Sequence, residues 1–290
     1  MANTIALAKN YTSILDEVYK KASVTADLTS DNTMVRAGAN ANEIVYPQIS
    51  VSGLGDYDRN SGYTNGSVNL EWKTATFNYD RGTKISVDVM DNEESRDIAF
   101  TMAGSELMRT KVAPEADAFV FATLAGKTGI SKAIPATYAD ATAFLTALIE
   151  AKNTMDEDEV PEEGRILYAT PTLLNGVMAL DTTKSREVLA TFSKTVKVPQ
   201  SRFYTAIDLL DGKTSGEEAG HYAKASTGKD INFMIVHKPA VIKFDKHTAS
   251  DIIPASANAN ADADISKYRK YGIVDVYDNK VAGIYLSHKA

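Results

Sequence analysis

The stretch that decides the fold runs from Asp91 to Gly126: DNEESRDIAFTMAGSELMRTKVAPEADAFVFATLAG. Asp91 precedes an apolar-periodic run and Glu94 follows three residues later, a pattern typical of a capped helix start. Apolar residues then recur at steps of three and four, the spacing that places side chains on one helical face: Ile98, Met102, Val112, Ala116, Phe119, Val120 and Leu124. A continuous helix over this stretch would be about 50 Å long at about 1.5 Å per residue. One small domain does not need a helix of that length. We therefore expect other parts of the structure to pack against its remaining faces.

Pro114 lies inside this predicted helix. Proline has no backbone N–H and disfavours the helical conformation of the residue before it, here Ala113. We therefore expect the helix to kink, or to divide into two segments, near this point.

Upstream of the helix the sequence predicts an arm and then strands. Residues 4–22 have an amphipathic helical pattern, and residues 23–43 are small and polar, which favours an extended linker. From Glu43 the period changes to two, as expected of strands with one wetter face; the alternating apolar residues are Val68, Leu70, Trp72, Ile85, Val87 and Val89. The segment between Ile49 and Val68 is rich in Gly and Asn, which suits turns. We expect a long, mobile hairpin there, held by another chain because isolated two-stranded hairpins are marginal in water.

Downstream the pattern is that of a compact mixed segment. It predicts a helix over 138–155, a short strand over 165–169, and a helix capped by Thr170 with Pro171 at its first position. Residues 181–229 are polar and Gly-rich, so loops should dominate there. The remaining predictions are core strands at 231–236 and 240–244, a loop tip at 255–264, and a closing hairpin of 273–277 with 282–286. Together these elements predict an α+β protein.

Composition excludes several classes of protein. Of 290 residues, 44% are hydrophobic and 24% are charged, as in a soluble protein with a sizeable core. The absence of cysteine excludes disulfides, thiolate metal sites and cysteine nucleophiles. The net charge of −7 argues against a sequence-independent nucleic-acid binder. Charged residues within the first 25 positions fit neither a signal peptide nor a membrane span, so we expect an intracellular, soluble product with no membrane partner.

No catalytic motif is found, and we predict no catalytic, cofactor-binding or metal-binding residues. Gly126-Lys127-Thr128 and Gly212-Lys213-Thr214 lack the earlier glycine of a phosphate-binding loop, since Phe121 and Ile207 stand there. The four histidines have no ligand spacing. Six carboxylates between Asp156 and Glu163 favour a solvated acidic loop, with a metal site of an α+β enzyme as the remote alternative.

Two single residues stay open at this stage. Trp72, in a predicted strand, is more often a packing residue than a binding platform. Arg81, between Asp80 and Gly82, is either a turn residue or a partner of another subunit.

Several short motifs in order resemble the major capsid proteins of tailed bacteriophages with the HK97-type fold. The resemblance covers roughly residues 44 to 290. Its motifs are Gly53-Leu-Gly-Asp-Tyr-Asp-Arg59, the Asp80-Arg-Gly82 turn leading to Ile85-Ser-Val-Asp88 and Asp91-x-x-Glu94, Pro114-Glu-Ala-Asp-Ala118, Val160-Pro-Glu-Glu-Gly-Arg165 running into Tyr168-Ala-Thr-Pro171, Val198-Pro-Gln-Ser-Arg202, and Ile231-Asn-Phe-Met-Ile-Val-His237.

The resemblance implies an architecture and a function. Residues 1–43 would be the N-terminal arm, 44–90 the E-loop and flanking strands, 91–164 the peripheral domain with its spine helix, and 165–290 mainly the axial domain, with part able to return to the peripheral domain. Many copies would self-assemble through pentamers and hexamers into an icosahedral head, in the host bacterial cytoplasm, around non-specifically contacted double-stranded DNA. No cofactor is implied. We expect the assembly interface to include the following residues: Tyr57, Arg59, Trp72, Asp80, Arg81 and Arg202.

The family pattern also leaves alternatives. Many members carry an N-terminal scaffolding region, so here either a separate scaffolding protein exists, which the starting Met favours, or the chain is a processed form. A portal protein is a further expected partner. Lys73 lies where some members crosslink, but no matching asparagine or glutamate is found, so that chemistry is not transferred. The alternative function is an encapsulin-like nanocompartment shell enclosing cargo enzymes.

Overall fold

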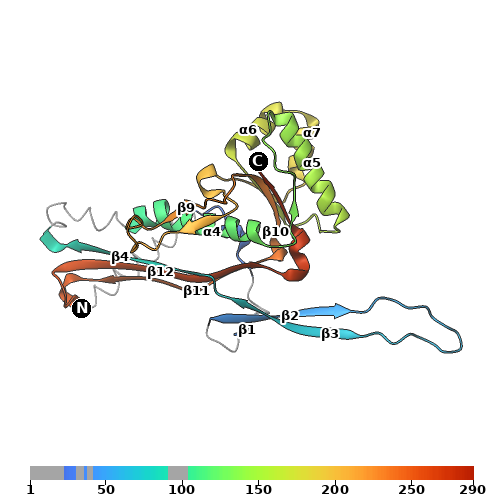
Figure 1. The fold of residues 1–290 in the computed structure, drawn as a ribbon, viewed down its shortest axis with the longest axis horizontal. Coiled ribbons are helices and arrows are strands. Elements are labelled where there is room, and N and C mark those ends of the chain that lie inside the picture. The colour runs from blue at the N-terminus through green and yellow to red at the C-terminus, as the bar shows by residue number, and fades with distance from the viewer. Residues whose placement is uncertain (1–22, 31–35, 38–41, 91–103) are drawn as a thin grey trace. The chain divides into compact units, whose positions relative to one another are not determined.

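The computed structural model describes residues 23–30, 36–37, 42–90 and 104–290. They form two units, a smaller one that spans Asp31–Asn78 and a larger one with the rest of the described chain (Figure 1). The predicted helix at 4–22, the cap at Asp91 and the first part of the long helix lie outside the described residues.

The smaller unit is an antiparallel hairpin with one added strand. Its sheet has the order β1-β2-β3, with β1 at Arg36–Ala37, β2 at Glu43–Val51 and β3 at Val68–Thr76. The pairing of β2 with β3 is unbroken from Glu43↔Thr76 to Val51↔Val68, and a long loop joins the two strands. The period-two pattern therefore predicts these strands correctly.

The larger unit is built on a five-stranded mixed sheet. Its order is β5-β13-β10-β6-β7, and the bounds are β5 Ser131–Lys132, β6 Arg165–Ala169, β7 Lys194–Lys197, β10 Ile231–His237 and β13 Ile284–His288. Every residue of β6 and β10 is buried. Successive side chains point to opposite faces, so Ile166 and Tyr168 join one core cluster while Leu167 and Ala169 join another. Both faces of this sheet must therefore be covered.

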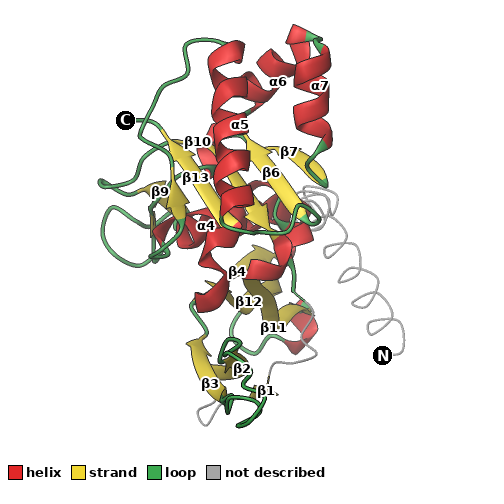
Figure 2. Ribbon diagram, turned by 90° about the vertical axis from the view of Figure 1, so that its right-hand side faces the viewer, coloured by secondary structure: helices red, strands yellow, loops and turns green. Residues whose placement is uncertain are grey.

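Helices provide that cover, as Figure 2 shows. One face carries α5 (Ala141–Glu157), α6 (Pro171–Leu180) and α7 (Thr183–Ala190), and the other carries α4 (Ala113–Gly126). The predicted helix at 138–155 and the strand at 165–169 are confirmed. Asp140 begins α5 by accepting a hydrogen bond from the backbone N–H of Ala143 at 2.8 Å.

The long helix continues through the proline. Residues 104–107 are helical, Met108–Val112 form a π-helical turn (η2), and α4 follows directly. Val112 and Ala113 both keep right-handed helical dihedral angles. The irregularity expected near Pro114 therefore takes the form of a π-helical turn just before it, one of the usual ways in which a helix absorbs a missing hydrogen bond.

A second, longer sheet covers the remaining side of α4. It has the antiparallel order β11-β12-β4, with β4 at Tyr79–Asp88, β11 at Val241–Ile253 and β12 at Ala263–Val276. Val241, Val274 and Val276 share the core cluster of Val120 and Leu124. Packing from two sheets explains why α4 is buried on nearly all sides. From the sequence we expect the other faces of this helix to rest on further structure, and the two sheets are that structure.

The minor elements are β8 (Ile207–Leu209) paired with β9 (Tyr222–Lys224), and the 3-10 helices η1 (Ala26–Leu28), η3 (Gln200–Arg202), η4 (Lys238–Ala240), η5 (Ala255–Ala257) and η6 (Asp278–Gly283).

The predicted closing hairpin is wrong. The strand that contains 273–276 is β12, which pairs with β11 and β4, whereas β13 pairs with β10 and β5. η6 carries the chain from one sheet to the other. Two adjacent apolar runs with a polar turn look like a hairpin locally, but here each run completes a different core.

Four smaller predictions need correction. The 23–43 linker is not simply extended, since it contains η1 and fully buries Leu28. The 181–229 region contains α7, a polar helix started by a capping box of Thr182 and Ser185. Thr170 stands at the N-cap of α6, but its side chain makes no capping hydrogen bond. The strand predicted at 240–244 extends to Ile253 because β12 pairs with it along its length.

Candidate functional site

One face of the hairpin carries an exposed apolar strip. We call it the hairpin strip, and it consists of Pro47, Ile49 and Val51 on β2 with Trp72, Leu70 and Val68 opposite them on β3. Directly opposite residues in an antiparallel pair share a face. Ile49 is 63% exposed, Val68 is 73% exposed and Trp72 is 46% exposed. Contiguous exposed apolar surface of this kind marks an interaction site.

The loop beyond the strip has its own local structure. Asp58 and Gly62 exchange two backbone hydrogen bonds, and the Asp58 carboxylate accepts the N–H groups of Asn60 and Ser61. These backbone donors lower the pKa of Asp58. The rings of Tyr57 and Tyr63 lie 4.8 Å apart between centroids. Tyr57 is 60% exposed and Arg59 is exposed.

Asp80 and Arg81 lie within strand β4 rather than in the predicted turn. Neighbouring strand residues point to opposite faces, so the two side chains reach different partners. Asp80 accepts two hydrogen bonds from Arg269 on β12, at 2.9 and 2.7 Å. This guanidinium lowers the pKa of Asp80. Gly82 is required beside them because a Cβ there would lie 2.8 Å from the carbonyl oxygen of Tyr268.

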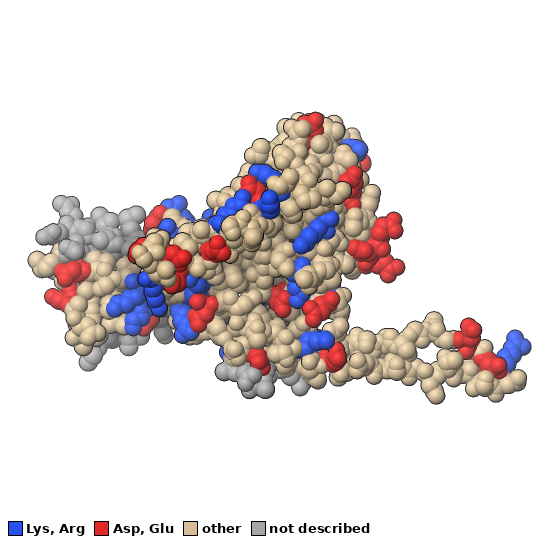
Figure 3. Space-filling view, in the orientation of Figure 1, with Lys and Arg blue, Asp and Glu red and all other residues tan. Residues whose placement is uncertain are grey.

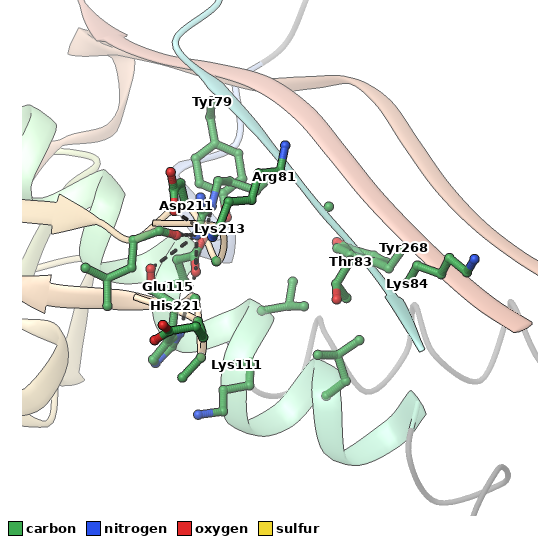
Figure 4. A pocket seen from close by; sticks show the side chains of 18 residues that line it. Tyr79, Arg81, Thr83, Lys84, Lys111, Glu115, Asp211, Lys213, His221 and Tyr268 are labelled. Atoms are coloured by element: carbon green, nitrogen blue, oxygen red, sulfur yellow. Dashed lines mark hydrogen bonds and ion pairs between the residues drawn. The ribbon is translucent and has the colours of Figure 1, made fainter. Parts of the chain in front are cut away.

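Arg81 faces inward and ties three elements together, as Figure 4 shows. Its Nε donates to Oε1 of Glu115 on α4 at 2.7 Å, and its Nη2 donates to the carbonyl oxygens of Leu210 and His221 at 2.7 and 3.2 Å. Leu210 and His221 are the two ends of the 211–220 loop, which a backbone bond between them also closes. Arg81 therefore holds the neck of this loop against α4.

Glu115 stays ionised at this position although it is only 7% exposed. Burial by itself would raise its pKa, but the neighbouring His221 ring and the hydrogen-bonded Arg81 guanidinium outweigh burial and leave the pKa of Glu115 below its ordinary value. The Tyr79 hydroxyl adds a donor at 3.3 Å. Nδ1 of His221 lies 3.5 Å from Oε2 of Glu115.

A cavity of about 520 Å³ opens beside this cluster. Its walls come from β4, the 104–115 helical stretch, the 211–220 loop and Tyr268. Asp211, on that loop, accepts the backbone N–H groups of Lys213 and Thr214, which lowers its pKa to about 2. The carboxylates of Glu115 and Asp211 in this cavity thus already accept hydrogen bonds from the protein itself. Their role is to hold the 211–220 loop in place.

Asp117, two residues after Glu115, is fully buried and anchors the start of the described chain. Its Oδ1 accepts from the side chains of Ser23 and Thr25 at 2.8 and 2.7 Å and from the Thr25 N–H at 3.2 Å. Its Oδ2 accepts from the Val24 N–H and from Nη1 of Arg202, both at 3.1 Å. We call this set the Asp117 clamp.

Lys243 on β11 completes the clamp from the other side. Its ammonium group donates to the carbonyl oxygen and the side chain of Thr25. Burial and the nearby Lys270 lower the pKa of Lys243 to about 8. Lys270 itself pairs with Asp245 at 3.1 Å. These pairs hold the N-terminal segment between α4 and the β11-β12-β4 sheet.

The acidic segment 156–163 is exposed and only partly paired. Asp156 pairs with Arg165 at 2.7 Å and Glu162 with Lys152 at 2.8 Å. Within the described residues, no group of three or more His, Asp or Glu side chains is arranged to hold a metal ion.

The described part of the chain contains no helix with the length and apolar character needed to cross a membrane.

The structure thus separates the six predicted interface residues into two groups. Tyr57, Arg59 and Trp72 belong to the exposed hairpin. Asp80, Arg81 and Arg202 make ion pairs within the larger unit, and the last two reach α4 through Glu115 and Asp117. Sequence reasoning missed these two carboxylates, although charges inside an apolar helix signal that buried partners must exist.

Comparison with solved structures shows which known fold the chain has. The cyanophage P-SCSP1u capsid structure aligns with a TM-score of 0.60 at 14% identity, over 93% of this chain and 88% of that one. The bacteriophage PhiM1 mature capsid aligns with a TM-score of 0.61 at 13% identity, over 88% and 84%. The chain has an HK97-like capsid fold. This confirms the predicted fold class.

The chain also aligns with a particle from a different source. The virus-like particle from Pyrococcus furiosus aligns with a TM-score of 0.60 at 9% identity, over 97% of this chain and 99% of that one. No protein-family model matches the chain, and a search of the curated proteins gives no match.

Proposed function

We propose that this chain is the major capsid protein of a tailed bacteriophage. Many copies assemble through pentamers and hexamers into an icosahedral head that encloses double-stranded DNA, and the protein acts as a structural element rather than as an enzyme. The assembled protein is then a virion component, put together in the cytoplasm of the host bacterium.

The hairpin strip is the observation that carries the proposal. A hairpin of two strands with one exposed apolar face is marginal by itself in water. A second copy that covers Ile49, Leu70 and their neighbours on the strip would remove this apolar surface from water, which contributes about 25 cal/mol per Å². The HK97-like fold supports the same conclusion, since the phage neighbours named above are capsids.

The predicted interface divides by role. We propose that Tyr57, Arg59 and Trp72 contact a neighbouring copy directly. For Asp80, Arg81 and Arg202 the interface assignment remains a prediction. Their ion pairs within the chain stabilise the fold that presents the contact surfaces. The same holds for the domain limits: arm 1–43, E-loop 44–90, peripheral domain 91–164 and a mainly axial 165–290.

Deleting the loop tip tests the proposal. We expect a variant that lacks residues 56–66 to fold but to form no regular shells, because those residues lie outside both core clusters of the larger unit. Size-exclusion chromatography with light scattering, followed by negative-stain microscopy of every peak, measures both properties. Wild-type chain that stays monomeric with crowding agents and a scaffolding protein would contradict the function, and normal shells from the deletion variant would contradict the role of the hairpin.

A second candidate is an encapsulin-like nanocompartment shell. The alignment over nearly the full length of both chains with the virus-like particle from Pyrococcus furiosus favours it as an alternative. Particles purified from the native cell separate the two: double-stranded DNA inside supports the phage head, and an enclosed enzyme supports the nanocompartment. A separate scaffolding protein and a portal protein are expected partners of the phage head only.

The remote metal-enzyme alternative has its own test. Replacing Asp156 and Asp158 with Ala should leave the metal content and the assembly of the protein unchanged. Loss of a bound metal in this variant would favour the enzyme.

A further inference from the structure

The β11-β12-β4 sheet places two lysines of like charge directly opposite each other. Lys84 on β4 is the cross-strand partner of Lys267 on β12, and both side chains are exposed. Like charges in this position destabilise a sheet. Among the described residues neither lysine has an ion-pair partner, whereas the neighbouring Arg269 is neutralised by Asp80. The pair is therefore a place where an outside anion would be favourable.

The rest of that row neutralises the pair only in part. Asp251 stands opposite Lys267 on β11, so one carboxylate faces two ammonium groups in this row of described residues. Lys246, also exposed, adds a further positive charge on β11. Figure 3 shows Lys and Arg side chains over this sheet with Asp and Glu side chains among them, in a chain whose net charge is −7.

The acidic segment 156–163 has the complementary property. Glu157, Glu159 and Glu163 are exposed, and their carboxylates make no ion pair with any described residue, while Asp156 and Glu162 are partly neutralised by Arg165 and Lys152. In Figure 3 Asp and Glu side chains gather beside the end of α5, on the opposite side of the larger unit from the β11-β12-β4 sheet. The two surfaces of one chain therefore cannot meet each other.

We propose that the lysine pair Lys84–Lys267 binds the acidic segment 156–163 of a second copy of this chain. The contact joins two different surfaces, so it is heterologous, and repetition of such a contact closes into a ring when the rotation allows. The inference rests on the proposed self-assembly and names the charged contact that accompanies the hairpin strip. Because both surfaces are exposed, this contact acts mainly on the rate and register of association, and salt weakens it.

Charge exchange tests the contact. Two double variants, K84E/K267E and E157K/E159K, each place like charges against the partner, and each should lower the association constant of the ring about tenfold or more at low salt. The quadruple variant restores opposite charges and should assemble as the wild type does. Light scattering at a fixed protein concentration measures the assembled fraction, and thermal melting checks that each variant is folded.

The matched controls lie on α7, which carries the exposed Lys184 and Glu187 without ion pairs to described residues. Lys184→Glu and Glu187→Lys should leave assembly unchanged. If a reversed double variant does not fold, the neutral variant K84Q/K267Q takes its place, and its assembly should lose most of the salt dependence seen in the wild type.

Two results would overturn the inference. They are normal assembly of the double variants and a folded quadruple variant that assembles no better than the doubles. A K84E/K267E variant that assembles normally but retains less double-stranded DNA would also make the β11-β12-β4 sheet a DNA-facing surface. In each of these cases the wild type still forms shells, so the proposed function survives; a wild type that never assembles would overturn both.

Discussion

The Asp117 side chain on α4 accepts a hydrogen bond from the backbone N–H of Thr25 at 3.2 Å, across a sequence separation of 92 residues. Both residues are fully buried. The same carboxylate accepts from Arg202, so one acidic group joins the N-terminal segment, α4 and the η3 turn. This relationship fixes residues 23–25 against α4.

Removal of the Asp117 carboxylate should destabilise the fold strongly. Asp117→Ala leaves the buried Thr25 N–H and the Arg202 guanidinium without this carboxylate, which should lower the free energy of unfolding by about 3–5 kcal/mol. Urea unfolding measures the loss. The control is Asp80→Ala, which breaks an exposed pair and should cost less than about 1 kcal/mol. Equal losses in the two variants would show that the Asp117 clamp contributes no more than a surface ion pair.

The Arg81–Glu115 pair should make stability depend on pH. Because the pKa of Glu115 is below its ordinary value in the folded chain, its carboxylate contributes stability that is fully present above that ordinary value and is lost as the pH falls through the folded pKa. Glu115→Gln should lower the free energy of unfolding by about 3 kcal/mol at neutral pH. The gap between the variant and the wild type should narrow as the pH falls below about 4.5.

Urea unfolding at a series of pH values measures that gap. Arg81→Lys provides a second variant, since a lysine cannot reach Glu115, Leu210 and His221 together as a guanidinium does. A gap that stays constant from neutral to acid pH would mean that Glu115 is not ionised in the folded chain.

Core and strip residues of the same kind should respond in opposite ways. Leu124 is fully buried, so Leu124→Ala should cost about 2–5 kcal/mol, and Leu124→Asp should prevent folding because it buries an unpaired charge. Solubility and thermal melting measure both. A normal melting transition for Leu124→Asp would contradict the packing of α4 between the two sheets.

In the hairpin strip the expected loss is in assembly alone. Leu70 is 52% exposed, and Leu70→Ser should change the free energy of unfolding by less than about 0.5 kcal/mol, as surface changes usually do. The variant should form fewer shells, or none, by negative-stain microscopy. Ser50→Thr, on the polar face of β2, is the matched control and should assemble normally.

Capping of α5 gives a local prediction. Asp140 accepts from the Ala143 N–H at 2.8 Å, so Asp140→Ala should lower stability by about 1 kcal/mol. Asp140→Ser keeps a capping oxygen and should recover most of that loss. Thermal melting of the three chains decides, and an unchanged melting temperature for Asp140→Ala would mean that tertiary packing alone positions the start of the helix.

The elements that the sequence alone determined are those whose information is local. Alternation at Val68, Leu70 and Trp72 specifies a strand, and apolar spacing around Leu124 specifies a helix, because side-chain direction follows from backbone geometry over a few residues. The apolar runs of β6 and β10 likewise predict buried strands. The order of the short motifs predicts the HK97-like fold.

Tertiary structure alone decided how these elements pair and which charges are buried. Whether β12 and β13 pair with each other depends on the other strands that compete for them. β12 pairs with β11 and β4 in the three-stranded sheet, and β13 pairs with β10 and β5 in the five-stranded sheet, which no local pattern encodes. The partners of Glu115 and Asp117 come from residues far away in the sequence, since a buried charge is stabilised by whichever opposite charge and donors the fold brings to it. The polar helix α7 escaped prediction for the same reason, because its position depends on packing over the sheet more than on its own apolar pattern.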